Sequence, residues 1–273
     1  MLVAPGAYDA LSARLIEAAG FSIVHATGAG ISCALGYPDV GLLTMTEVLW
    51  QVERMVAATA IPLIADADTG YGNVVNVHRT VKEFERRGVA GLHIEDQVFP
   101  KKCGLLAGKE VVSIDEMVGK IKAAVDARTD QDFVIIARTD ARDSRGLEEV
   151  IERGNAFRDA GADMIFVYGA HSVEELERIA REIDGPLMTH ISRGAKFSNI
   201  TADDLQRIGY RLVIFALAPL EIAANAVKMF LEHLRRTGTE GYFVSEMMSY
   251  DQLYGLVGLA EVTALEKRYG ATS

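Results

Sequence analysis

The chain has 273 residues, of which 49% are hydrophobic and 24% are charged, a composition that suits one large hydrophobic core. Its net charge of -10 argues against nucleic acid and against an anionic membrane surface as partners. There is no apolar run of about 18 residues, no signal-peptide pattern at the start, and too few cysteines for a disulfide framework. We therefore expect a soluble, cytoplasmic protein with free thiols and no membrane partner.

One module recurs along the chain: a helical pattern ends at a glycine, and a short apolar run follows at once. The glycines that end these helical patterns are Gly20, Gly88, Gly161 and Gly209. A glycine just after a helix is typical of its C-terminal cap, and a near-continuous apolar run is typical of a parallel strand buried on both faces. In chain order, the runs predict eight strands near residues 2–6, 21–26, 62–67, 91–95, 133–138, 163–168, 186–191 and 211–216.

The segments between these runs carry helical periodicity, as in residues 73–88, where apolar side chains recur three or four positions apart. Strands that alternate with helices at this length predict an α/β fold of the (β/α)8 TIM barrel type, with a doubly wound sheet as the second choice. No linker divides the sequence, so we expect one barrel domain over residues 1–273. Residues 220–273 exceed what eight such units need, and we interpret them as a C-terminal helical extension that packs on the barrel or on a neighbouring subunit.

Carboxylates gather where two predicted strands end. Asp66 and Asp68 are spaced by two, which puts them on one face of a strand, and Glu95 ends the next strand along the chain. In a barrel the carboxyl ends of the strands meet at one mouth. Carboxylates brought together there repel each other unless a cation joins them, and Mg²⁺ favours such oxygen ligands. The alternative is that each Asp only caps the helix that follows it.

Two other strand ends suggest recognition of an anion. Arg138 would clamp a substrate carboxylate with two parallel hydrogen bonds; the alternative is a structural ion-pair residue. Thr27 is followed by a glycine turn, "TGAG", whose backbone N–H groups can closely approach an anionic oxygen. The turn lacks the pattern of a dinucleotide-binding loop.

The segment "FPKKCGLLAGKE", residues 99–110, follows a strand end and places Cys103 after two lysines. We interpret it as a loop over the barrel mouth, in which Lys101 and Lys102 would lower the pKa of the thiol if they approach it. The alternative is an incidental surface cysteine. Cys33, in contrast, is expected to be a small core residue. No spacing of histidines and cysteines suggests zinc.

Several longer motifs resemble one known family. They are "APGAYDALSA", "ATGAG", "LGYPDVGLLT", "IADADTGYGN", "VAGLHIEDQVFPKKCG", "GKEVVS" and "IIARTDA". Over nearly its whole length the chain resembles the isocitrate lyase and phosphoenolpyruvate mutase superfamily. It is most similar to the short-chain branch of methylisocitrate lyase, dimethylmalate lyase, oxaloacetate hydrolase and carboxyphosphonoenolpyruvate mutase.

The resemblance implies a lyase that uses Mg²⁺, or alternatively Mn²⁺, to cleave a carbon–carbon bond of a 2-hydroxy or 2-oxo carboxylic acid. It implies a metal site formed by Asp39, Asp66, Asp68 and Glu95. It implies that the turn of Thr27, Gly28 and Ala29, together with Asp66 and Arg138, holds the small anionic substrate. Catalysis would fall to Cys103 as proton donor on a gating loop, with Lys101 and Arg138. The resemblance also implies a homotetramer in which terminal helices are exchanged between subunits.

Four positions depart from the pattern of the lyases. Leu105 stands where the "KKCG" motif is usually followed by histidine. Tyr168 and Arg193 each replace a glutamate, and His190 replaces an asparagine. We expect Tyr168, His190 and Arg193 to line the substrate pocket and to admit a different, more anionic group than the usual one. These departures leave two alternatives open: a phosphonomutase or oxo-acid hydrolase, and a non-catalytic descendant that binds an oxo acid.

Overall fold

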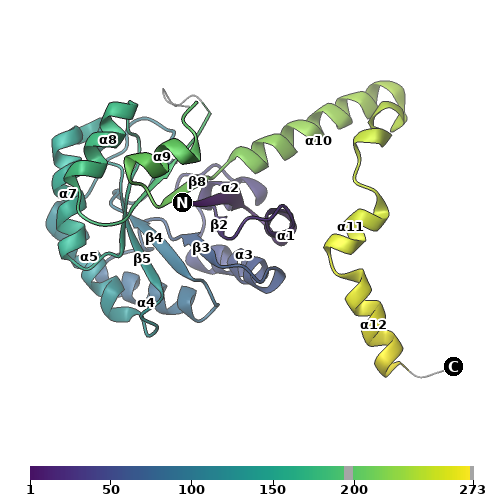
Figure 1. The fold of residues 1–273 in the computed structure, drawn as a ribbon, viewed down its shortest axis with the longest axis horizontal. Coiled ribbons are helices and arrows are strands. Elements are labelled where there is room, and N and C mark those ends of the chain that lie inside the picture. Colours follow the sequence, from purple (N-terminus) through teal and green to yellow (C-terminus); the bar gives the residue numbers. More distant parts are fainter. Residues whose placement is uncertain (194–198, 271–273) are drawn as a thin grey trace. The chain divides into compact units, whose positions relative to one another are not determined.

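The structure is a computed structural model that describes residues 1–193 and 199–270. The chain divides into two compact units, Met1–Pro219 and Leu220–Ser273. The strands are β1 (Leu2–Ala7), β2 (Val24–Ala26), β3 (Leu63–Asp66), β4 (Gly91–Glu95), β5 (Val134–Thr139), β6 (Met164–Val167), β7 (Leu187–His190) and β8 (Leu212–Phe215). They are parallel and follow chain order around a closed barrel, in which β8 pairs with β1 (Figure 1). The predicted (β/α)8 barrel is confirmed.

The helices of the first unit follow the strands as predicted. They are α1 (Ala10–Ala18), α2 (Gly28–Ala34), α3 (Met45–Ala58), α4 (Val74–Glu85), α5 (Ile114–Ala127), α6 (Arg142–Arg145), α7 (Leu147–Asp159), α8 (Val173–Glu182) and α9 (Ala202–Ile208). Helix α4 illustrates why they form where they do. The Asn73 side chain accepts hydrogen bonds from the first backbone N–H groups, and Val77, Val81 and Phe84 form the buried face.

One predicted boundary was wrong. The sequence placed the second strand at residues 21–26, but β2 begins at Val24. The preceding helix closes with Gly20 at a φ of 88°, and the N–H of Phe21 donates back to the carbonyl of Ile16. This cap motif uses the residues that follow the helix, so the chain becomes extended only afterwards. Phe21 is consequently 37% exposed at the end of the barrel opposite the strand C-termini.

Two hydrophobic cores support the barrel. The larger lies between strands and helices and includes Val81, Phe84 and Phe157. The smaller fills the barrel interior and consists of Ala4, Ile23, Ile64, Ile136, Phe166, Met188, Leu212 and Ile214. Because side chains alternate along a strand, the residue two positions after an interior residue also points inward, one layer nearer the C-terminal mouth. This alternation fixes which side chains face the mouth.

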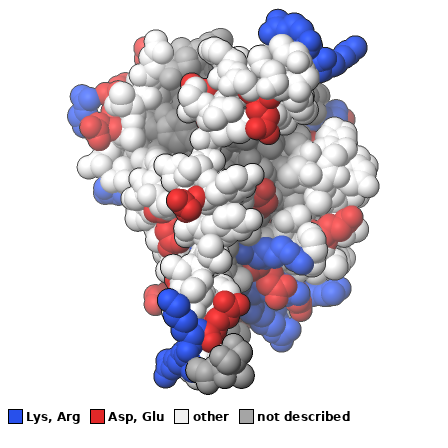
Figure 2. Space-filling model, turned by 90° about the vertical axis from the view of Figure 1, so that its right-hand side faces the viewer, with Lys and Arg blue, Asp and Glu red and all other residues white. Residues whose placement is uncertain are grey.

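The second unit is entirely helical in its described part. Its elements are α10 (Ala218–Thr237), which begins at the end of the first unit, the 3-10 helix η1 (Gly241–Glu246), α11 (Tyr250–Leu256) and α12 (Leu259–Tyr269). None of these four elements contains a buried residue. Apolar side chains such as Ile222 and Tyr250 are 70% and 80% exposed. Figure 2 views a face on which large areas carry neither acidic nor basic groups. None of the described helices is long and apolar enough to cross a membrane.

Candidate active site

The polar residues at the strand ends stand directly on the inner core. In four strands an apolar interior residue is followed two positions later by a predicted site residue: Ile64 by Asp66, Ile136 by Arg138, Phe166 by Tyr168, and Met188 by His190. Glu95 ends β4, and Thr27 directly follows β2. All of these side chains therefore belong to the C-terminal mouth, where barrel enzymes place their chemistry.

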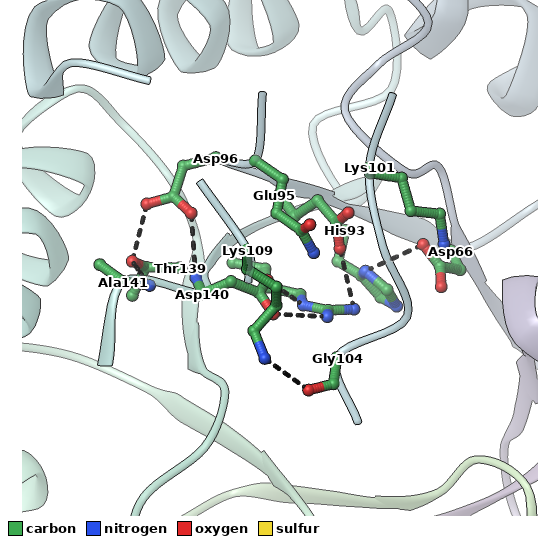
Figure 3. Close-up of polar contacts among 12 residues, drawn as sticks. Asp66, His93, Glu95, Asp96, Lys101, Gly104, Lys109, Thr139, Asp140 and Ala141 are labelled. Carbon is green, nitrogen blue, oxygen red and sulfur yellow. Dashed lines mark hydrogen bonds and ion pairs between the residues drawn. The ribbon is translucent and has the colours of Figure 1, made fainter. Parts of the chain in front are cut away.

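Lys101 lies within the predicted acidic cluster (Figure 3). Its ammonium group pairs with the Asp39 carboxylate and lies 2.7 Å from Oδ1 of Asp68, and its side chain is only 3% exposed. Burial acts against its charge, but the surrounding carboxylates, Asp68 foremost, raise the pKa of Lys101 well above its usual value. Asp68 itself has a φ of 47°, a strained backbone conformation of the kind found at functional sites. Lys101 thus contacts two of the four predicted metal ligands and balances one negative charge.

A pair of histidines lies behind Asp66. Nδ1 of His93 is 3.5 Å from Oδ1 of Asp66, and Nε2 of His93 is 3.0 Å from Nε2 of His25. Burial lowers the pKa of His25 to about 3 and that of His93 to about 4, so both rings are neutral near pH 7. A neutral pair joined through both Nε2 atoms shares one hydrogen, so only one of the two rings donates there. The sequence did not predict this contact, because the two histidines are 68 residues apart.

Arg138 is held by two carboxylates. Its Nε and Nη2 donate to Asp140 at 2.8 and 2.9 Å, and its Nη1 lies 3.1 Å from Oε2 of Glu95. Both oxygens of Glu95 are buried without a hydrogen-bond partner among the described residues, so the contact with Arg138 is an ion pair of poor hydrogen-bond geometry. Burial raises the pKa of Glu95 well above its usual value, although Arg138 opposes this.

Residues 99–110 form a loop that closes over the cluster. The backbone N–H of Cys103 donates to the carbonyl of Asp39 at 2.9 Å, and Gln97 exchanges two hydrogen bonds with the backbone of Lys102. The predicted lowering of the thiol pKa by the lysines does not dominate: Lys101 acts in that direction but pairs with the carboxylates, and Lys102 donates to the carbonyl of Gly108. Burial instead raises the pKa of the Cys103 thiol. The thiol is therefore protonated near neutral pH and suited to give a proton.

Cys33 was predicted to be a core residue, and this was wrong. It is exposed near the end of the short helix α2, whose buried residues are Gly28, Gly30, Ile31 and Ser32. At the start of this helix, Thr27 accepts a hydrogen bond from the N–H of Gly30. Gly28 packs so closely against Asp66 that a Cβ atom would lie 2.7 Å from Oδ2. The first N–H groups of α2, including those of Gly28 and Ala29, have no acceptor within the helix.

Tyr168 and His190 form one side of the mouth. Their rings stack with centroids 4.0 Å apart and planes 8° apart, and Cζ of Arg138 lies 4.6 Å from the Tyr168 centroid. Gly104 of the loop rests on the same ring. Arg193 is exposed three residues beyond β7, next to the segment 194–198 that the structure does not describe.

The four predicted metal ligands have the right chemistry for a hard divalent cation, but their side chains are not grouped closely enough to hold one. Asp39, Asp66, Asp68 and Glu95 offer only oxygen atoms, and the buried oxygens of Glu95 lack a hydrogen-bond donor. Within residues 1–193 and 199–270, however, no three His, Cys, Asp or Glu side chains lie close enough together to hold an ion. Lys101 pairs with Asp39 and Asp68, and Arg138 pairs with Glu95, so cationic side chains contact three of the four carboxylates.

Three buried residues that support the site were not predicted as site residues. Asp96 accepts hydrogen bonds from the hydroxyl of Thr139 at 2.7 Å and from the N–H of Asp140 at 2.9 Å (Figure 3). It also accepts a hydrogen bond from Arg153 at 3.1 Å. Arg153 also donates to the carbonyl of Val112, just after the loop. Lys109 donates to the carbonyl of Gly104 at 2.6 Å. Of the three, only Asp96 had a sequence signal, the polar strand end "IED"; nothing in the sequence pattern singled out Arg153 or Lys109.

The chain is similar to known proteins in both sequence and structure. The family described as phosphoenolpyruvate phosphomutase matches residues 1–235. The 2,3-dimethylmalate lyase of Eubacterium barkeri is 44% identical over 98% of this chain and 93% of its own length. The structure of an oxaloacetate acetylhydrolase with 3,3-difluorooxalacetate superposes with a TM-score of 0.94 at 37% identity, covering 100% of this chain and 93% of that one. A phosphonopyruvate hydrolase in complex with oxalate and Mg²⁺ has a TM-score of 0.90 at 32% identity, covering 98% and 94%.

The family match spans most of the chain, and the closed barrel is the fold that the motifs implied. The chain belongs to the phosphoenolpyruvate mutase/isocitrate lyase superfamily.

Proposed function

We propose that the chain is a carbon–carbon bond lyase that cleaves a 2-hydroxy carboxylic acid to a 2-oxo acid and a second carboxylate. The observation that carries the proposal is the position of Cys103. Its thiol is on a loop that is hydrogen-bonded to the acidic cluster through Asp39, and burial keeps it protonated. The 44% identity to a 2,3-dimethylmalate lyase over nearly the full length supports the same reaction class.

The cleavage is redox-neutral and needs one proton removed and one delivered. The hydroxyl proton leaves to the acidic cluster, the C2–C3 bond breaks, and its electron pair moves to C3, where the adjacent carboxylate delocalises it. The thiol of Cys103 then gives its proton to C3, because a buried thiol with a raised pKa holds that proton until a stronger base arrives. The closed loop keeps water from competing as the donor.

Asp39, Asp66, Asp68 and Glu95 would hold Mg²⁺, or Mn²⁺ in its place, and the bound ion would supply electrostatic stabilisation of charge on the substrate oxygen. The N–H groups that open α2, from Gly28 onward, are the protein's own donors for that oxygen. The Mg²⁺ complex of the related phosphonopyruvate hydrolase supports this choice of metal.

The test is incubation of the chain with Mg²⁺ and a panel of 2-hydroxy dicarboxylates, followed by proton NMR, with EDTA as the metal-free control. We expect a 2-oxo acid and a second carboxylate in equal amounts, formed only with the metal. Oxalate and acetate from oxaloacetate, without cleavage of any hydroxy acid, would identify a hydrolase instead. In a parallel incubation with a phosphonate, followed by phosphorus NMR, a signal that moves from phosphonate to phosphate ester would identify a mutase. Binding of oxalate with no turnover of any acid would indicate a non-catalytic protein.

We also propose that a second copy of this chain covers the C-terminal helices, within a homotetramer. Helices α10 to α12 bury no residue of their own, and Val262 and Leu265 of α12 are 51% and 55% exposed. A helix normally buries its apolar stripe against another element. Analytical ultracentrifugation should give a tetramer for the wild type and a smaller species for Leu265→Glu. A monomeric wild type at micromolar concentration would contradict the proposal. A cytoplasmic location remains a prediction from the two free cysteines.

A further inference from the structure

The side of the mouth formed by β6 and β7 is aromatic where the rest of the site is charged. Tyr168 directly follows β6 and is stacked on His190, the last residue of β7. Phe166 packs edge-on against both rings from the interior core, with centroid distances of 6.1 and 6.0 Å. Three rings locked together in this way form a rigid surface. We call the pair Tyr168 and His190 the aromatic wall.

The closed loop leaves little free space next to the wall. An ideal Cβ built on Gly104 would lie 2.2 Å from Cζ of Tyr168 and 2.5 Å from Cε1, so only a glycine can rest on the ring. The carbonyl of Gly104 is held by Lys109 at 2.6 Å, which fixes the orientation of this contact. The Tyr168 ring therefore fills the space between the loop and the guanidinium of Arg138. A substrate group that extends in this direction must displace a ring that several neighbours hold in place.

The cations near the wall are already paired. Arg138 uses three nitrogens on the carboxylates of Asp140 and Glu95. Lys109 lies 5.6 Å from the Tyr168 centroid, but it donates to two carbonyls and lies 3.3 Å from Asp143. An additional substrate carboxylate against the wall would lose its water without gaining an uncommitted cation from this pair.

His190 offers a single polar contact. Its Nδ1 atom is buried and has no hydrogen-bond partner in the described part of the chain, and the side chain is 9% exposed. Burial, with the charges of Arg138 and Lys109, lowers its pKa to about 3, so the ring is neutral near pH 7. A neutral ring nitrogen can serve one hydroxyl or one carboxylate oxygen, but it cannot balance a charge.

We propose that the aromatic wall of Tyr168 and His190 determines specificity by restricting the enzyme to compact dicarboxylates. Tyr168 excludes a tricarboxylate, and Nδ1 of His190 binds one substrate oxygen. The inference rests on the proposed function and names its substrate class. It differs from the more anionic substrate that the sequence suggested, because the nearby cations are committed and the ring occupies the space. A pocket without room for an added group discriminates by roughly tenfold to 200-fold.

Calorimetric titration with malate and with citrate, each in the presence of Mg²⁺, tests the inference. We expect the wild type to bind malate at least about tenfold more tightly than citrate. Tyr168→Ala should reduce that ratio by at least about tenfold, whereas Tyr168→Phe should keep it. His190→Phe preserves the stack and removes the nitrogen, so it should weaken both acids by a similar factor and leave the ratio unchanged. Phe21→Ala, at the opposite end of the barrel, is the matched control and should change neither affinity.

Equal or tighter binding of citrate by the wild type would overturn the inference, as would an unchanged ratio in Tyr168→Ala. If Tyr168→Ala does not fold, as judged by circular dichroism, Tyr168→Leu makes the same test with a smaller loss of volume. The binding ratio needs no turnover. A protein that cleaves no hydroxy acid but shows the expected affinity ratios between malate and citrate would contradict the proposed reaction and still support the role of the aromatic wall in specificity. A lyase whose kcat/KM ratio between the two acids is unaffected by Tyr168→Ala would support the proposed reaction and contradict the role of the aromatic wall in specificity.

Discussion

The ammonium nitrogen of Lys101 lies 2.7 Å from Oδ1 of Asp68 and also pairs with Asp39, in a position where its side chain is 3% exposed. This contact joins the loop that carries Cys103 to two of the predicted metal ligands. Loop closure and charge balance in the cluster are therefore coupled, because the same ammonium group serves both.

Lys101→Met removes the ammonium but keeps most of the side chain's volume. Without metal, the carboxylates of Asp39 and Asp68 are left buried without their cation, and the free energy of unfolding should fall by about 3 kcal/mol. Urea denaturation in the presence of EDTA measures this change in the free energy of unfolding. Mg²⁺ should then stabilise the variant more than it stabilises the wild type. Lys102→Met is the matched control, since Lys102 is exposed and bonds only a carbonyl at its side-chain end. Equal stability of the two variants would show that Lys101 does not balance the cluster.

Gly104→Ala tests how the loop rests on the aromatic wall. The new Cβ would lie 2.2 Å from Tyr168, so the closed loop must lift. We expect turnover to fall by roughly 10- to 100-fold, because a small displacement of a catalytic group has costs of this order. Trypsin should also cut the loop faster. The comparison is Gly119→Ala on α5, where the nearest atom is an ordinary 3.5 Å away, and both readouts should remain at wild-type levels. A Gly104→Ala enzyme with normal turnover would show that the loop need not rest on Tyr168 for catalysis.

The pKa of His190 predicts a pH dependence of stability. Its folded pKa, about 3, is below the unfolded value of 6.5, so between these values the unfolded chain binds more protons. The free energy of unfolding therefore falls as the pH drops through this window. His190 should contribute about 2 kcal/mol of that loss between pH 6.5 and pH 5. Denaturation at several pH values should show a shallower slope for His190→Phe than for the wild type. Identical slopes for wild type and His190→Phe would disprove the assignment.

Arg153→Leu tests the buried support beneath the loop. Removing the guanidinium leaves the carboxylate of Asp96 without its cation, which should lower the free energy of unfolding by about 3–5 kcal/mol. The carbonyl of Val112, just after the loop, also loses a donor, so loop proteolysis should accelerate. Arg178→Leu removes exposed ion pairs on α8 and should have no measurable effect. Comparable stabilities of the two arginine variants would refute the supporting role of Arg153.

The barrel was predictable because its signals are local. Apolar runs buried on both faces and the glycines that end the helices are visible in any short window, as the φ of 102° at Gly161 bears out. The polar strand ends gave Asp66, Glu95 and Arg138 for the same reason. The barrel fold places these three residues at its C-terminal mouth. The structure then shows which side chains they pair with.

Which side chains pair with one another at the mouth was not predictable. The pairing of Arg138 with Asp140 rather than with open solvent depends on side-chain geometry that no spacing rule gives. The thiol pKa was predicted in the wrong direction because the sequence shows that two lysines precede Cys103, but not that burial of the thiol outweighs their effect. Likewise, the residue types at Tyr168 and His190 indicated a changed pocket, whereas only their stacking indicates which substrates it would exclude.

The most direct test of the central claim, that Cys103 gives the proton to the departing carbon, is cleavage of the best hydroxy acid in D₂O, followed by NMR of the second carboxylate. The wild type should place one deuterium at the former C3 with a single stereochemistry. Cys103→Ser should bind the substrate with near wild-type affinity but lower kcat by at least about 100-fold, since general acid catalysis contributes roughly 10²–10⁴-fold. Unchanged kcat and unchanged stereochemistry in Cys103→Ser would contradict the account.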